Sequence, residues 1–278
     1  YAERLLSRTP QNPPTSVSEK ASGAAPAQNM QAIPLSDVAW YKAASAETVS
    51  AAAISSLGVD SIVNEVATNK VAAIKSLKAL LDARPIGVSA RFIIDFYSHA
   101  GRAAALEPLA AVFAESSRSA YEVSETSLAL ANLFEYLGDK GRAAQMIAEG
   151  LKAWAPAMSP AQEIMLRSKL ADLYLAVGDR RSQAEAKALY ALSPQDASVL
   201  EIYGWVMLQS ARETDLAVAA LEKAAKYAPE RPERLYRLAM AYLAGGQTLE
   251  ARKALVKALK LPGDFPSRVE AERRLEAL

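Results

Sequence analysis

The last third of the sequence repeats itself with a period of about 35 residues, and this period constrains the fold more than any other feature. The residues at matching positions are Leu200, Tyr203, Gly204, Met207, Ala217, Leu221 and Ala224 in one unit, and Leu235, Leu238, Ala239, Tyr242, Ala251, Leu255 and Ala258 in the next. Their spacing follows one face of a helix in each half of the unit. The period therefore predicts an all-α stack of helical hairpins, each burying its apolar face against its neighbours.

The composition of the chain divides it into four expected parts. Residues 1–36 are rich in Pro, Ala and Ser and poor in bulky apolar residues, which predicts a linker or tether. Residues 37–85 predict an N-terminal helical pair that resembles a degenerate repeat. Residues 86–265 predict the repeat array, and residues 266–278 a closing helix.

Turn signals and apolar periodicity predict the individual helices. In the N-terminal pair they favour a helix at 37–56, ended by Gly58, and another at 60–83 that is interrupted near Thr68-Asn69. In the array, Pro108 indicates a kink or a late start within the second helix. The array helices are expected at 88–99, 102–116, 124–137, 141–154, 160–177, 181–192, 197–210, 214–227, 232–244 and 248–260, followed by closure from 267.

Composition and charge argue against several classes of chemistry. The chain has no Cys and one His, which argues against disulfides, thiol catalysis and most transition-metal sites. His99 ends a helix, where a cation is favourable, and is interpreted as a capping or surface residue. Gly245-Gly246 lies between two helices and is not a phosphate loop. We therefore predict no enzyme, no cofactor and no metal.

Charge and hydropathy also limit the partners. The formal net charge is +1, and the basic clusters at Arg180-Arg181 and at Arg231, Arg234 and Arg237 are interleaved with acids. Such clusters are typical of solvated helix faces, and no nucleic-acid partner is predicted. No apolar run approaches the roughly 20 residues that cross a bilayer.

The residues of the hairpins resemble the tetratricopeptide repeat (TPR) family over roughly 88–278. The motif is found at Leu130, Ala131, Phe134, Gly138, Asp139, Ala143, Ile147 and Gly150, and again at Leu170, Ala171, Tyr174, Gly178 and Asp179. The resemblance implies a right-handed superhelical solenoid of about five to six hairpins with a C-terminal closing helix.

The resemblance also implies that the first helices of the hairpins line a concave groove that binds a protein or peptide. The expected groove residues are Arg91, Asp95, Asn132, Tyr136, Lys169, Asp172, Trp205, Tyr236, Arg237 and Met240, together with Phe92, Leu128, Glu135, Met165, Glu201, Gln209 and Glu233 on the same helices. Trp205 is the strongest candidate, because Trp is enriched at binding hot spots. The alternative for each aromatic residue is packing between hairpins. Asp95 and Met165 replace residues that chaperone-binding TPR domains use to clamp a terminal carboxylate, so no such clamp is predicted.

A narrower resemblance concerns the context. Tyr203-Gly204-Trp205 and Asp264-Phe265-Pro266 are similar to the C-terminal parts of TPR proteins in bacterial envelope and exopolysaccharide export systems. This favours a non-enzymatic interaction scaffold in an envelope assembly or secretion complex, in the periplasm or associated with the envelope, with the cytoplasm as the alternative compartment. The alternatives are a structural module that docks through its convex face or its ends, and a polysaccharide-handling module.

Overall fold

The structure of the chain is a computed structural model that describes residues 58–83 and 89–278. All of these residues belong to one unit, Ala32–Leu278. The tether expected at 1–36 and the helix expected at 37–56 lie outside the described residues. The described residues form helices joined by turns and contain no strand. None of the described helices has the length and apolar character that crossing a membrane requires.

The first two helix pairs of the described chain are short or bent. Helix α3 (Val59–Glu65) packs against α4 (Lys70–Ala83), and the break between them lies at Thr68-Asn69 as predicted. Helix α5 (Ala90–His99) is followed by α6 (Ala103–Leu106), η2 (Glu107–Leu109) and α7 (Ala110–Glu115). Pro108 lies in the short 3₁₀ turn η2, which confirms the predicted kink.

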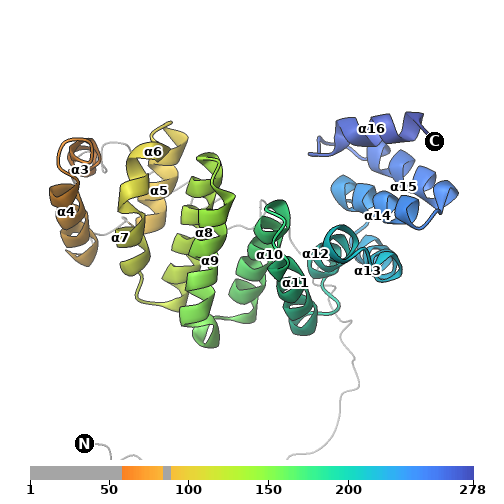
Figure 1. The fold of residues 1–278 in the computed structure, drawn as a ribbon, viewed down its shortest axis with the longest axis horizontal. Helices are drawn as coiled ribbons and strands as arrows, with labels where there is room; N and C mark the ends of the chain where they lie inside the picture. The colour runs from red at the N-terminus through yellow and green to blue at the C-terminus, as the bar shows by residue number, and fades with distance from the viewer. Residues whose placement is uncertain (1–57, 84–88) are drawn as a thin grey trace, which may run out of the picture. The chain divides into compact units, whose positions relative to one another are not determined.

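Four longer hairpins follow, and in each of them the two helices lie side by side (Figure 1). The chain closes with α16 (Arg268–Glu276), which contacts α15. A short 3₁₀ turn, η3 (Ala155–Ala157), follows the first of these hairpins. The hairpins are α8 (Ala120–Tyr136) with α9 (Lys140–Trp154), α10 (Pro160–Ala176) with α11 (Arg181–Leu192), α12 (Ala197–Val206) with α13 (Thr214–Tyr227), and α14 (Pro232–Ala244) with α15 (Thr248–Lys260).

Side-chain caps and glycine turns account for several of the helix ends. The Asp139 carboxylate accepts a hydrogen bond from the backbone N–H of Arg142 at 2.8 Å, and Gly138 before it has φ of +80°. Helix α8 begins four residues before the predicted start at 124, so that expected boundary was wrong. Ser119 caps this helix by accepting from the backbone N–H of Glu122 at 3.2 Å.

Small residues let the two helices of each hairpin approach closely. Ala131, Ala171, Gly204 and Ala239 are buried on the first helices, and Ala143, Ser182, Ala217 and Ala251 are buried on the second helices. A Cβ atom at position 204 would lie 2.8 Å from Cγ of Leu221 and 3.1 Å from the carbonyl oxygen of Ala217. This contact explains the requirement for glycine at that position.

The turn between α12 and α13 departs from the other hairpin turns. The end of the first helix widens into a π-helical turn, η4 (Met207–Ala211). Arg212 then adopts φ of +56°, and within the described chain it is the single non-glycine residue with positive φ. Glycine takes this backbone conformation in the turns at Gly101, Gly138, Gly178 and Gly246. The third of the four longer hairpins therefore has a strained turn shortly after Trp205 and Val206.

Candidate functional site

Four consecutive first helices place a non-repeating residue at the same position. Each of these residues follows directly after the buried small residue of its helix, so it lies about 100° farther around the helix axis. Asn132 and Asp172 are exposed, whereas Trp205 and Met240 are half-buried. We call these four residues, from α8, α10, α12 and α14, the central row.

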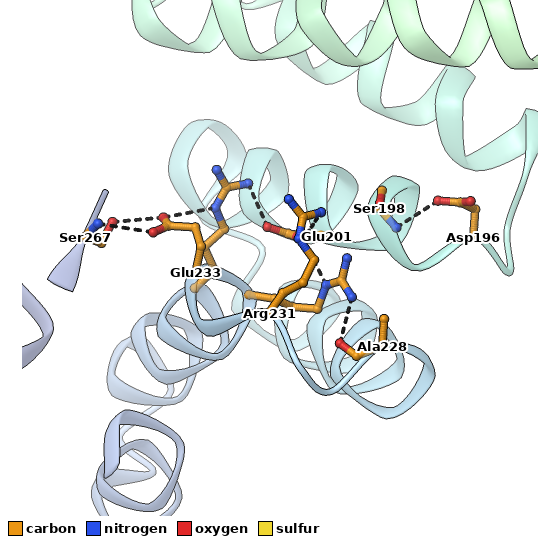
Figure 2. A network of polar contacts seen from close by, with 9 residues as sticks. Asp196, Ser198, Glu201, Ala228, Arg231, Glu233 and Ser267 are labelled. Carbon is orange, nitrogen blue, oxygen red and sulfur yellow. Dashed lines mark hydrogen bonds and ion pairs between the residues drawn. The ribbon is translucent and has the colours of Figure 1, made fainter. Parts of the chain in front are cut away.

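A series of charged contacts runs beside the central row from α8 to α16. Lys169 on α10 pairs with Glu135 on α8. Arg237 on α14 lies 3.5 Å from Glu201 on α12 and 3.6 Å from Glu233 on its own helix. The Glu233 carboxylate accepts a 2.9 Å hydrogen bond from the hydroxyl of Ser267, which precedes α16 (Figure 2). The contacts therefore tie α8 to α10, α12 to α14, and α14 to the residue that precedes α16.

The centre of this series is a buried ion pair between Glu201 and Arg234. Arg234 is 1% exposed, its Nε donates to Oε2 of Glu201 at 2.9 Å, and its Nη1 donates to the Ala228 carbonyl at 2.8 Å. Arg231 approaches the same carboxylate to 3.9 Å (Figure 2). Burial lowers the pKa of Arg234, whereas the Glu201 carboxylate counteracts this shift. The guanidinium is charged in either case, because the pKa of Arg is so high.

The prediction of a solvated face was therefore wrong for Arg234, although it is confirmed for Arg180 and Arg181, which are exposed. The physical reason is the neighbouring helix, which supplies a carboxylate to Arg234. A buried charge is tolerated only when it is paired and hydrogen-bonded.

Trp205 has both packing contacts and an accessible part. It packs against the core cluster that contains Leu208 and Leu238. The guanidinium carbon of Arg237 lies 5.3 Å from the centre of its ring, within the range of a cation–π interaction. The Nε atom of Arg237 is buried and has no hydrogen-bond acceptor among the described residues. Part of the Trp205 ring is thus used for packing between hairpins, which was the alternative to partner binding, and Arg237 covers another part.

Asp172 differs from the acids around it. Lys169 pairs with Glu135 and Arg237 pairs with Glu201, whereas the Asp172 carboxylate has no hydrogen bond or ion pair with any described residue. Its side chain is exposed, yet the protein around it desolvates the carboxylate and raises its pKa. Arg237 opposes this shift most strongly, and Glu201 adds to it. Asp172 is therefore an accessible anion without a fixed partner in the described part of the chain.

The remaining predicted groove residues have different environments. Arg91 pairs with Glu125 on α8 and lies 3.3 Å from Asp95 on its own helix. Burial raises the pKa of Asp95, and Arg91 opposes this shift. Tyr136 is 66% exposed, whereas Tyr236 is buried in a core cluster with Phe265 and Ala271. Tyr236 therefore offers little surface to a partner.

Acidic residues accompany the cations on this face. Glu135, Glu201 and Glu233 were expected at groove positions and Glu125 was not, and each of the four pairs with a cation on the predicted face. The sequence carries a signal for such ion pairs, because several of the paired residues are separated by about one repeat. The separation is 33 residues for Glu201 and Arg234, and 35 for Glu107 and Arg142.

The face is balanced in charge around the central row. Four cations, Lys169, Arg231, Arg234 and Arg237, lie among four acids, Glu135, Asp172, Glu201 and Glu233. Such a surface has no strong field of one sign. Across residues 58–83 and 89–278, no group of three or more His, Cys, Asp or Glu side chains is placed to hold a metal ion.

Comparison with known proteins gives matches at the level of structure. No protein-family profile and no curated protein matches the chain. Among solved structures, the TPR protein TTC0263 from Thermus thermophilus is similar with a TM-score of 0.51 and 23% identity, over 67% of this chain and 97% of that chain. MamA from Desulfovibrio magneticus RS-1 is similar with a TM-score of 0.48 and 19% identity, over 66% of this chain and 93% of that chain.

A third solved structure, YrrB, is described as a TPR protein with an unusual peptide-binding site. Its TM-score is 0.49 at 13% identity, and the match covers 77% of this chain and 99% of that chain. The likeness to TTC0263 concerns the fold alone, and it agrees with the helix pairs and small-residue positions described above. The chain therefore has the all-helical, TPR-like solenoid fold that its repeats predict.

Proposed function

We propose that the chain is a non-enzymatic scaffold that binds a segment of a protein partner along the first-helix face. The observation that carries this proposal is the central row, in which each hairpin contributes a different side chain at the same place. Residues that maintain the stack recur from hairpin to hairpin, whereas Asn132, Asp172, Trp205 and Met240 do not. Solenoids of stacked repeats present extended surfaces of this kind to their partners.

The side chains of the central row indicate what kind of ligand segment would bind there. Asp172 is an accessible carboxylate without a fixed partner among the described residues, so it suits a Lys or Arg side chain of the ligand. Trp205 and Met240 offer apolar surface on the next two helices, which suits a large apolar side chain. Asn132 offers hydrogen bonds to a peptide backbone on the other side of Asp172. We therefore propose a partner segment with a basic residue followed or preceded by an apolar residue.

The test is affinity purification from the native host, followed by binding measurements with the recovered partner. Asp172→Ala, Asn132→Ala and Trp205→Ala are each expected to weaken binding by about 10- to 100-fold, as is common for hot-spot residues. Tyr227→Ala, at an exposed position on the second helix α13, should leave binding unchanged. Circular dichroism is needed for Trp205→Ala, because this side chain also packs in the core.

Full retention of every partner by the exposed Asp172→Ala and Asn132→Ala variants would reject the first-helix face. If changes on the second helices removed the partners instead, the structural-module alternative, in which the convex face docks, would replace this proposal. Tyr227→Ala therefore serves as both control and test of the rival.

We also propose that this scaffold acts in a bacterial envelope assembly or secretion complex. The support is the sequence similarity at Tyr203-Gly204-Trp205 and Asp264-Phe265-Pro266 to proteins of envelope export systems. Fractionation of the native host is expected to recover the protein with the periplasm, and recovery in the cytoplasm would contradict this context. Binding of anionic polysaccharide that weakens steeply with salt would favour the polysaccharide-handling alternative.

A further inference from the structure

The outer face of α15, the second helix of the last hairpin, combines cations with exposed apolar side chains. Its residues line an open cavity of about 510 Å³: Leu249, Arg252, Lys253, Val256, Lys257 and Lys260, with Leu261 at the end of the helix. Leu249 is 60% exposed, and Val256 and Leu261 are half-buried. We call this surface the α15 outer face.

The cations of the α15 outer face are largely without acidic partners. Arg252, Lys257 and Lys260 form no ion pair with a described residue, and Lys253 reaches Glu250 only at 4.0 Å. Other exposed arginines of the described helices have acidic partners, as Arg181 has in Asp179 and Arg273 has in Glu270, whereas exposed lysines such as Lys223 and Lys226 on α13 also form no ion pair with a described residue. The α15 outer face is therefore a local excess of positive charge in a chain of nearly zero net charge.

The preceding hairpin shows that the fold does not require these residues. The buried residues Ala217, Leu221 and Ala224 of α13 correspond to Ala251, Leu255 and Ala258 of α15. In this register, the positions of the α15 outer face are occupied on α13 by Asp215, Val218, Ala219, Glu222, Lys223, Lys226 and Tyr227. The α13 face carries two acids and two cations, and it has fewer large apolar residues. The packing of a hairpin therefore does not require the combination of cations and large apolar residues that the α15 outer face carries.

We propose that the α15 outer face docks an acidic segment of another protein, with a bulky apolar side chain of that segment in the cavity. Charge complementarity carries this choice, because exposed cations without acidic partners favour a partner segment that supplies carboxylates. The apolar lining calls for an apolar anchor between those carboxylates. A nucleic acid would pair with the cations and leave Leu249 and Val256 uncovered. A bilayer surface would meet the cations without filling the cavity.

The probe is a synthetic amphipathic peptide of about 15 residues, with Glu side chains flanking a stripe of Leu and Phe at helical spacing. Two further peptides serve for comparison: one carries Ser in place of Leu and Phe, and the other carries Lys in place of Glu. Vesicles of phosphatidylcholine and phosphatidylserine test the membrane alternative. We expect saturable binding of the acidic amphipathic peptide alone, measured by fluorescence anisotropy.

Variants of the exposed residues locate the binding. Leu249→Ser with Val256→Ser, which leaves the charge unchanged, is expected to weaken binding at least about tenfold, as is Arg252→Glu with Lys257→Glu. The matched variants on α13, Val218→Ser and Lys223→Glu, should leave it unchanged, and so should Asp172→Ala on the first-helix face.

Three results would overturn the proposal. They are absence of saturable peptide binding, equal binding of the Ser-substituted peptide, and binding of vesicles in preference to the peptide. Circular dichroism of each variant shows whether α15 is still folded. If Leu249→Ser with Val256→Ser disturbed the hairpin, Leu249→Ser alone, at the most exposed apolar position, provides the same test.

Discussion

At the scale of single residues, Asp172 is the position where stability and function are expected to conflict. Its carboxylate is desolvated without a fixed partner among the described residues, so its pKa in the folded protein is raised above 3.8, the value for an unperturbed Asp. A raised pKa means that the folded state binds the proton more tightly than the unfolded state does. The free energy of unfolding therefore falls as the pH rises from the pKa of Asp172 in the unfolded state through its raised pKa in the folded state, because the carboxylate becomes ionised.

Asp172→Asn should accordingly stabilise the protein at neutral pH and not at about pH 3, where both states carry the protonated acid. The gain is expected to be below about 1 kcal/mol, because the side chain is exposed and solvent screens its interactions. Urea unfolding at the two pH values measures it. Asp215→Asn, on the solvated α13 face, is the control, and an equal gain at both pH values would contradict the explanation.

The buried pair of Glu201 and Arg234 makes a second prediction at this scale. Glu201→Gln leaves the buried guanidinium without its counter-ion and should lower the free energy of unfolding by about 3 kcal/mol. Glu201→Leu with Arg234→Met removes both charges and should cost much less than the sum of the two single changes. Urea unfolding followed by circular dichroism provides the measurement. Additive losses would show that the two side chains are not coupled.

At the scale of elements, the close approach of α12 and α13 depends on glycine. Gly204→Ala would place its Cβ against Leu221 and the Ala217 carbonyl, and overpacking of this kind costs about 1 to 3 kcal/mol. The better helix propensity of Ala offsets about 1 kcal/mol of this destabilisation. Gly141→Ala is the matched control, because its Cβ would meet only the Asp139 carboxylate at 3.4 Å. Thermal unfolding should show Gly204→Ala destabilised and Gly141→Ala unchanged or stabilised.

Most element boundaries could be predicted because local chemistry determines them. Helices α11, α13, α14 and α15 have the predicted bounds, since Gly, Pro and polar turn residues flank them. The start of α8 was missed by four residues, because a Ser cap is a weak signal among many serines. The π-helical turn η4 and the positive φ of Arg212 were not predicted. They depend on how α12 meets α13, which local propensity does not encode.

The candidate site could be predicted only in part, for the same reason. The repeat register places Asn132, Asp172, Trp205 and Met240 at equivalent positions, and this could be obtained from the spacing of small residues. Whether a side chain there is free or paired depends on the next hairpin. Arg234 lies one helical turn after the exposed Arg231, and its burial is explained by the Glu201 carboxylate on α12 together with the Ala228 carbonyl.

At the scale of the whole molecule, the stack is expected to lose structure from its ends. Phe265 and Ala271 are buried against Leu235 and Tyr236, so the closing segment covers the last hairpin. Removal of residues 266–278 should speed amide exchange in α14 and α15 and leave α8 to α11 unchanged, because each hairpin contacts mainly its neighbours. Hydrogen exchange with mass spectrometry tests this. Uniform acceleration along the chain would indicate a single cooperative unit.

The ion pairs that cross from one hairpin to the next also mean that the hairpins are not interchangeable. Glu107 meets Arg142, Glu135 meets Lys169, and Glu201 meets Arg234, each about one repeat later in the chain. Excision of α10 and α11 would leave Glu135 without Lys169. Each hairpin therefore carries charges that match the next hairpin. Insertion or removal of a hairpin would keep these ion pairs only if the charged residues of its neighbours changed at the same time.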